Sequence, residues 1–378
     1  MKSALRAAAT GLLRHVPVPV WRRLFPKSAV GICYHIVSDA EVPHVRHYSF
    51  LDTVAFEADL RYLRRTFGFV SYGELAKRRG GASAVRDNAA IVTFDDGFAE
   101  CATVAAPILR RQGAGGVFFV ITDLIDNAAV FRETEASLCI AAIGRRTTAE
   151  VEAIVEELGL GTRLAPPPRA ASDTVRAPLR LAGLGDLAEH GPPPLLHWLL
   201  TLKAADAALL RQLSARLGVD PEGYIRSTRP YLTATQIREL HAEGFTIGAH
   251  GRDHRWLQDL SLAEAEREIV DSCRVIRDLT GQREVPFAFP YFGGGIDRGW
   301  LARLRQQHEF IGLFFDTDGL REDVPFVVQR VFGERIGHDR TPDAILRRAW
   351  ARPAAWRRRG QSFSSRFRRC AQTAERAL

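Results

Sequence analysis

Two short motifs in the sequence combine residue types that bind metal ions and move protons. The first is the pair Asp95-Asp96, which follows an apolar run and precedes Gly97. Two adjacent carboxylates repel each other, so a cation or a shared proton is expected beside them. The second is His250 with His254, whose spacing lets both rings face one ion if the segment curls into a helical turn. Two histidines with one aspartate would form a metal site that leaves positions open for water and substrate.

Both motifs also have ordinary structural explanations. Asp-Gly is a common turn dipeptide, so Asp96-Gly97 taken alone is as compatible with a turn as with a site. A lone histidine is more often structural than functional, but a pair such as His250 and His254 directly after a strand favours a ligand role. The case for a site therefore depends on whether the fold brings the two motifs together.

Seven short apolar runs predict the strands that must position these residues. They are Ala29–His35, Ala90–Asp95, Gly116–Ile121, Phe245–His250, Val285–Phe289, Phe310–Phe315 and Phe326–Val331. The segments between them are predicted helices, three of which begin with the spacing of a capping box at Ser71, Thr233 and Ser261. Strands that alternate with helices are joined in parallel by right-handed crossovers, so we expect an α/β barrel or barrel-like sheet.

Polar residues gather where these predicted strands end. They are His35, Asp95, Asp96, Asp123, His250, Pro290, Tyr291, Asp316 and Arg330. In a barrel of parallel strands the carboxyl ends of all strands meet at one face, and that face carries the chemistry. Solvation alone does not explain polar groups at so many strand ends, so the sequence predicts one shared site.

The charge of the chain divides it into three parts. Of the net charge of +8, residues 1–27 carry +6 and residues 347–378 carry +9, which leaves −7 for residues 28–346. We therefore expect a basic amphipathic N-terminal segment (1–27), a catalytic domain (28–346) and an Arg-rich C-terminal tail (347–378). Within the domain, the strand rhythm stops between about residues 124 and 229, which predicts a mostly helical insertion.

Composition excludes several other classes of protein. The five cysteines are scattered and form no CxxC pair, which argues against a disulfide framework or a cysteine zinc site and favours a reducing compartment. No apolar run approaches the ~20 residues of a membrane span. Arg6 and Arg14 interrupt any signal-peptide core, so the N-terminus is expected to stay uncleaved.

The motifs together resemble those of the polysaccharide deacetylase family (NodB homology, carbohydrate esterase family 4). The resemblance rests on Thr93–Phe98 (TFDDGF), on the His250/His254 pair and on Phe289-Pro290-Tyr291, and Tyr34–Asp39 resembles an opening segment of the family. It covers roughly residues 28–123 and 230–335. It implies a distorted (β/α)7 barrel, here with the helical insertion outside it.

The resemblance also implies roles for individual residues. Asp95 would be the general base, and Asp96 would bind a divalent metal, most simply zinc, together with His250 and His254. The backbone N–H of Tyr291 would help to hold the oxyanion. The reaction would be hydrolysis of an N-acetyl or other acyl group on a sugar of a polysaccharide, glycan or lipid-linked glycan.

Three departures from the family pattern leave roles open. Gly251 stands where Ser or Thr usually follows the first histidine. Val285–Phe289 lacks the arginine that often orients the base, and Arg330 is either its substitute or part of a structural salt bridge. The family's late Leu-x-His, which supplies the general acid, is absent after Arg330. His338, His35 or another group would then protonate the leaving amine.

Other functions fit parts of the sequence. Asp316–Gly319 (DTDG) imitates the start of a haloacid-dehalogenase-type phosphatase, but too few residues follow it, and Asp316 is expected to line the deacetylase pocket instead. A catalytically silent sugar-binding relative at the membrane surface is the main alternative.

The basic ends suggest where the protein acts. We expect a cytoplasmic enzyme in reversible contact with an anionic membrane, aided by shallow insertion of aromatic residues such as Trp21 and Trp350. No nucleic-acid partner is expected, and a solvated tail is the simplest alternative to membrane contact.

Overall fold

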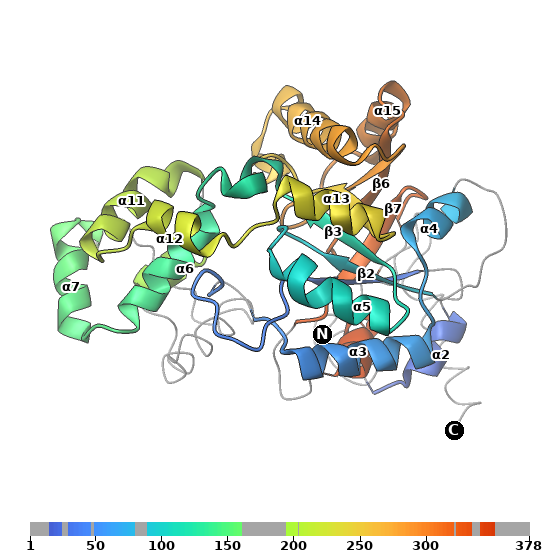
Figure 1. Ribbon diagram of the computed structural model, residues 1–378, viewed down its shortest axis with the longest axis horizontal. Coiled ribbons are helices and arrows are strands. Elements are labelled where there is room, and N and C mark those ends of the chain that lie inside the picture. Colours follow the sequence, from blue (N-terminus) through green and yellow to red (C-terminus); the bar gives the residue numbers. More distant parts are fainter. Residues whose placement is uncertain are drawn as a thin grey trace, which may run out of the picture. The chain divides into compact units, whose positions relative to one another are not determined.

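The computed structural model describes residues 15–24, 29–46, 49–79, 89–160, 194–202, 204–320, 323–334 and 341–351 (Figure 1). The chain forms two compact units. Unit 1 comprises Met1–Val37, Thr53–Thr122 and Thr233–Leu378, and unit 2 comprises Ser38–Asp52 and Asp123–Leu232. Of the segments discussed above, His338, most of the N-terminal segment and most of the Arg-rich tail lie outside the described residues.

Unit 1 is built around a closed barrel of seven parallel strands. The strands are β1 (Val30–Tyr34), β2 (Ala90–Phe94), β3 (Gly116–Val120), β4 (Thr246–Ala249), β5 (Val285–Ala288), β6 (Ile311–Asp316) and β7 (Val327–Phe332). Each strand pairs with the next, and β7 closes the barrel by pairing with β1, where Arg330 lies opposite Gly31. The expected α/β barrel with seven strands is confirmed.

Helices surround this barrel and connect its strands (Figure 1). Those of unit 1 are α2 (Val18–Leu24), α3 (Thr53–Thr66), α4 (Tyr72–Arg79), η1 (Cys101–Ala105), α5 (Ala106–Arg111), α13 (Ala234–Ala242), η5 (Leu257–Asp259), α14 (Leu262–Thr280), α15 (Arg298–Gln307) and α16 (Pro342–Ala351). The capping boxes predicted at Thr233 and Ser261 are formed. At Ser71 the same two bonds are present: the backbone N–H of Ser71 donates to Glu74 Oε2, and the backbone N–H of Glu74 donates to Ser71 Oγ. Each box satisfies backbone N–H groups that the first helical turn leaves without partners.

The strands of the barrel are buried on both faces, which is why they are apolar without alternation. The helices instead bury one stripe each. In α14, Ile269, Cys273 and Ile276 are fully buried at spacings of three and four residues, while Leu262 and Val275 are exposed. The packed barrel fixes the ends of its strands, and these ends carry the candidate site.

Unit 2 is mostly helical, as expected for the insertion. Its helices are α6 (Arg132–Ile143), α7 (Thr148–Glu157), α10 (Pro194–Leu199), η4 (Ala204–Asp206), α11 (Ala207–Arg216) and α12 (Pro221–Thr228), and η2 (Thr122–Asn127) leads into the unit. They enclose their own apolar core, which includes Ile140, Leu199 and Leu213. Residues 161–193 of this segment lie outside the described part of the chain.

Helices α2 and α16 pack together through two tryptophans of unit 1. The rings of Trp21 and Trp350 stack with their centroids 6.4 Å apart, and their exposed fractions are 0% and 2%. These two side chains, expected from the sequence to insert into a membrane, are instead part of the core. No helix within the described residues combines the length and the apolar character that crossing a bilayer requires.

Candidate active site

Four strands of unit 1 bring together five of the polar residues that the sequence predicted at strand ends. His35 follows β1, Asp95 and Asp96 follow β2, and His250 follows β4. Arg330 lies within β7 and contributes its side chain to the same place. The fold thus joins the two motifs that are 154 residues apart in the chain.

Asp96, His250 and His254 form a group that fits a metal ion. Their nearest ligand atoms all lie within 4.8 Å of one another, and all three residues are buried. Asp96 Oδ1 is 3.5 Å from His250 Nε2 and 3.7 Å from His254 Nε2. His250 Nδ1 is 2.9 Å from the carbonyl oxygen of Ala288, which can only accept, so Nδ1 carries the proton and Nε2 presents a lone pair toward Asp96. Two imidazole nitrogens and one carboxylate oxygen are a donor set that suits zinc.

The charge state of His250 agrees with a ligand role. Burial lowers its pKa from 6.5 to about 4, even though the carboxylate of Asp95 opposes this shift. The ring is therefore neutral at physiological pH, as a metal ligand must be.

The backbone around these ligands is left-handed at several positions. Asp96, His254 and Tyr291 have φ of 70°, 59° and 59°, and they are three of the six non-glycine residues with positive φ in the described part of the chain. Such conformations cost energy and tend to persist at functional sites. The helical turn that would let His250 and His254 face one ion is not formed, since residues 251–256 are not helical. The backbone is instead left-handed at Gly251 and His254, and the two rings lie 4.9 Å apart.

The glycine that departs from the family pattern has a structural reason. Gly251 has φ of 79°, and a Cβ there would lie 3.2 Å from Glu268 Oε2. That oxygen already accepts a hydrogen bond from the backbone N–H of Arg252 at 2.8 Å. A serine or threonine would therefore meet both backbone strain and a crowded carboxylate at this position.

Asp95 is held by a buried arginine. Arg330 Nη1 and Nη2 donate to Asp95 Oδ1 and Oδ2 at 2.7 Å and 2.8 Å, and Nη1 also bonds to Thr93 Oγ1 at 3.0 Å. The guanidinium has no exposed surface and lies over the rings of Phe119 and Phe315. Burial alone would raise the pKa of Asp95, but the charge of Arg330 outweighs it and holds this pKa well below its usual range.

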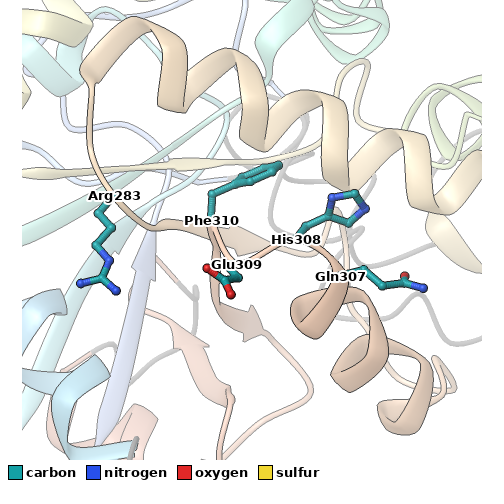
Figure 2. A pocket seen from close by; sticks show the side chains of 5 residues that line it. All are labelled: Arg283, Gln307, His308, Glu309 and Phe310. Carbon is teal, nitrogen blue, oxygen red and sulfur yellow. The ribbon is translucent and has the colours of Figure 1, made fainter.

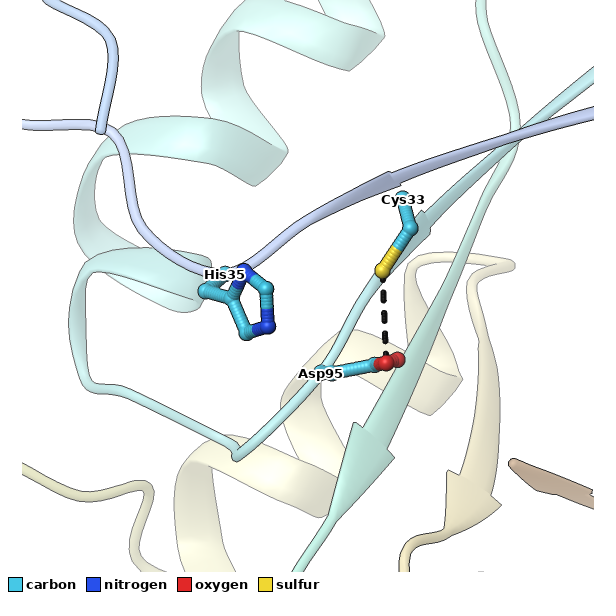
Figure 3. Close-up of side chains that lie close together, drawn as sticks. All are labelled: Cys33, His35 and Asp95. Carbon is cyan, nitrogen blue, oxygen red and sulfur yellow. Dashed lines mark hydrogen bonds between the residues drawn. The ribbon is translucent and has the colours of Figure 1, made fainter. Parts of the chain in front are cut away.

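His35 is hydrogen-bonded to an acidic residue that was not predicted from the sequence. Its Nδ1 lies 2.7 Å from Glu334 Oε2, and its backbone N–H donates to Glu334 Oε1 at 2.6 Å. Burial disfavours protonation of His35, but Glu334, Asp96 and Asp95 outweigh it and raise its pKa from 6.5 to about 9. Figure 3 shows His35 beside Asp95 and Cys33, whose thiol donates to Asp95 Oδ2 at 3.2 Å.

The group of Cys33, His35 and Asp95 is a poorer metal site than the first one. Its ligand atoms also lie within 4.8 Å of one another, but both oxygens of Asp95 already accept from Arg330. Burial also raises the pKa of the Cys33 thiol well above its ordinary value, so the thiolate that a metal needs is disfavoured.

The side chain of Asp316 holds the loop that carries Tyr291 through hydrogen bonds. This carboxylate accepts from the backbone N–H groups of Gly293 and Thr317, both at 2.8 Å, and pairs with Arg298 at 2.8 Å. Asp316 has no exposed surface, so the expectation that it lines the pocket is wrong: it supports the loop instead. It also ends the sixth strand of the barrel, whereas the phosphatase alternative requires the first strand of a domain.

A hollow of about 350 Å³ lies elsewhere on unit 1 (Figure 2). Its lining residues are Arg283, Gln307, His308, Glu309 and Phe310. They precede β5 and β6, so the hollow is at the amino ends of the strands and not at the ends that hold the metal ligands.

Glu334, Arg298 and Thr93 are the polar partners that sequence reasoning missed. Glu334 stands two residues after β7, so the rule that selected the other strand-end residues would have found it. Arg298 opens a helix and Thr93 lies inside a strand, and nothing in their local patterns distinguishes them from ordinary helix and strand residues.

Comparison with known proteins agrees with this picture. Residues 218–308 match the family of polysaccharide deacetylases, a span that contains His250, His254 and Tyr291 but not Asp95 and Asp96. No curated protein sequence matches the chain.

Solved structures of other proteins align with this chain at low sequence identity. The deacetylase PplD of Streptococcus pyogenes, in complex with acetate, aligns with a TM-score of 0.50 and 14% identity over 86% of this chain and 99% of its own. IcaB from Ammonifex degensii aligns with a TM-score of 0.45 and 18% identity over 86% and 97%. The barrel and the match over residues 218–308 therefore confirm the resemblance of this chain to the polysaccharide deacetylases.

Proposed function

We propose that the protein is a metal-dependent hydrolase that removes an N-acetyl or other acyl group from a sugar of a polysaccharide, glycan or glycolipid precursor. The observation that carries this proposal is the group of Asp96, His250 and His254 beside the Asp95–Arg330 pair. The match to polysaccharide deacetylases over residues 218–308 supports the choice of reaction.

Asp96, His250 and His254 would hold the ion, for which zinc is the best fit to the donor set. A divalent ion at this position would acidify water and polarise the acyl carbonyl. The buried surroundings strengthen the electrostatic interactions made there.

Asp95 would accept the proton of the attacking water as the water oxygen bonds to the acyl carbon. Because Arg330 keeps the pKa of Asp95 low, this carboxylate stays ionised at any physiological pH, but it is a weak base. It therefore needs an acidified water, and the neighbouring metal ligands are consistent with that requirement. Arg330 is a positioning residue in this scheme, since it holds both oxygens of Asp95.

His35 would give a proton to the sugar nitrogen as the carbon–nitrogen bond breaks. Glu334 accepts from the Nδ1 side, which leaves the Nε2 proton available to the substrate. The raised pKa of His35, about 9, keeps the ring protonated at neutral pH. The backbone N–H of Tyr291 would donate to the oxyanion.

The test combines metal analysis with acetate release. The purified full-length protein should contain one zinc per chain and release acetate from at least one of a panel of N-acetylated oligosaccharides and lipid-linked sugars. His250→Ala and His254→Ala should lose the metal, whereas Asp95→Asn should retain it and lose turnover. A protein that binds the sugars and metal but releases no acetate would instead be the catalytically silent relative.

We also propose that the enzyme acts in the cytoplasm at an anionic membrane surface. The support is the charge of the sequence, +6 in residues 1–27 and +9 in residues 347–378. With Trp21 and Trp350 buried, the attraction would be mainly electrostatic. Co-sedimentation with anionic vesicles should fall as salt rises and fall again when residues 352–378 are deleted, and equal pelleting with neutral vesicles would contradict the proposal.

A further inference from the structure

Two aromatic side chains are exposed next to the candidate metal ligands. Tyr291 and Phe292 have exposed fractions of 41% and 38%, and they belong to a set of only five large hydrophobic residues that are comparably exposed among the described residues. The other three, Val54, Leu262 and Val275, lie on helices. Adjacent exposed aromatic residues beside a reactive centre favour a binding surface.

The rings of these two residues pack beside the ring of Trp256, which is partly exposed, and we call the three residues the aromatic face (Trp256, Tyr291 and Phe292). The ring of Trp256 lies 5.1 Å from that of Phe292 and 6.2 Å from that of Tyr291. The ring of Tyr291 lies 4.8 Å from that of His254. The aromatic face therefore adjoins a candidate metal ligand.

The loop that carries the aromatic face is fixed on two sides. Gln258 Nε2 donates to the carbonyl oxygens of Phe292 and Gly294, which ties the loop to the segment of Trp256. Arg298 Nη1 donates to the carbonyl oxygen of Gly293 at 2.8 Å, opposite the bond from Gly293 to Asp316. Because the rings stand on a backbone that is already ordered, a ligand that stacks on them loses little energy to ordering the loop.

A carboxylate borders the same surface. A methyl group placed on Gly294 would lie 3.2 Å from the ring of Phe292 and 3.5 Å from Asp318 Oδ2. The ring and the carboxylate of Asp318 therefore border one small space, and Asp318 is exposed. This pairing suits a ligand with one apolar face and hydroxyl groups at its edge.

We propose that the aromatic face binds a pyranose ring of the substrate, adjacent to the sugar that carries the acyl group. The proposal rests on the function proposed above. The electron-rich faces of the aromatic rings attract the C–H groups of a sugar ring, and the carboxylate of Asp318 accepts from its hydroxyls. A lipid tail would gain nothing from that carboxylate, so the sugar chain is the better match.

The test compares ligands that do and do not reach the aromatic face. The wild-type full chain should bind a pentasaccharide of N-acetylglucosamine about tenfold more tightly than free N-acetylglucosamine, as measured by calorimetry. Phe292→Ala should remove most of that difference, and Phe292→Tyr should keep it. Val275→Ala, which truncates a similarly exposed side chain on α14, should also keep it.

The possible outcomes separate this proposal from the proposed function. Pentasaccharide binding no tighter than that of the monosaccharide, or equal losses for both ligands in Phe292→Ala, would overturn the role of the aromatic face. If Phe292→Ala loses affinity only for lipid-linked sugars, the aromatic face binds a lipid and not a sugar ring, and the proposal is overturned. Tight pentasaccharide binding that depends on Phe292, without acetate release from any sugar, would support the aromatic face and contradict the deacetylase function.

Discussion

Replacing Arg330 by glutamine should both destabilise the protein and weaken its proposed base. The arginine makes two charge-assisted hydrogen bonds to Asp95, and the two residues are 0% and 3% exposed. Removing one partner of a buried ion pair leaves the other charge without compensation, at a cost of about 3–5 kcal/mol. Two lost hydrogen bonds to a charged group, at about 1.5–3 kcal/mol each, give a similar figure. The expected loss is a large part of the free energy of unfolding of a typical protein, which is about 5–15 kcal/mol.

The same substitution should change how activity depends on pH. In the wild type the charge of Arg330 outweighs burial and keeps the pKa of Asp95 low, so Asp95 remains ionised as the pH falls through 5. Without that charge, the burial of Asp95 raises this pKa. Asp95 then takes up a proton at a higher pH, and the acid limb of kcat/KM should move to higher pH.

The assays are urea unfolding and pH–rate profiles of the metal-loaded enzyme. Arg330→Lys keeps the charge but not the two parallel bonds, so its acid limb should move less than that of Arg330→Gln. The double variant Arg330→Gln/Asp95→Asn removes both charges and should be more stable than Arg330→Gln alone. If the free energy of unfolding of Arg330→Gln lies within about 1 kcal/mol of that of the wild type and its acid limb does not move, the inferred role of the ion pair is contradicted.

Two further predictions concern single positions. Gly251→Ser should lower the free energy of unfolding by about 1–2 kcal/mol through its left-handed backbone alone, and further through contact with a carboxylate. Gly113→Ala is the control for the cost of the left-handed backbone alone, because Gly113 has φ of 61° and no atom lies within 4 Å of the added Cβ. If both variants lose the same free energy of unfolding, the contact with the carboxylate has no role. His44 in unit 2 is buried, and this burial lowers its pKa from 6.5 to about 4. Because the unfolded chain then takes up a proton at a higher pH than the folded protein does, the stability that the neutral His44 contributes is complete above pH 6.5 and is lost as the pH falls toward 4. The wild type should therefore lose up to about 3 kcal/mol more than His44→Gln between pH 7 and pH 4 in urea unfolding, and parallel losses would contradict this assignment.

The barrel could be predicted from the sequence because its signals are local. Strands buried on both faces are continuous apolar runs, such as Gly116–Val120, and the capping box at Ser261 marks where α14 begins. The candidate ligands could be predicted for a related reason. Parallel strands end at one face, so Asp96 and His250 needed only to follow strands in order to lie near each other.

Other parts of the site depend on information that no short segment contains. The turn between His250 and His254 uses left-handed residues, and a spacing of four residues alone suggests a helix. Asp316 ends a strand as the ligands do, but the backbone N–H of Gly293 and the side chain of Arg298 occupy its oxygens. Which partner a strand-end carboxylate takes is decided by the loops that pack against it.

The partner of Asp95 illustrates how closure of the barrel makes a site. Arg330 belongs to the last strand, β7, and Asp95 follows the second strand, so the two meet only because β7 pairs with β1 and β1 pairs with β2. The residue of β1 opposite Arg330 is Gly31, where a Cβ would lie 2.6 Å from Arg330 Cγ. A side chain at that position would occupy the space through which the arginine reaches Asp95. Arg330 thus contacts Asp95 from the last strand of the barrel, and the absence of a side chain at Gly31 leaves the space in which it does so.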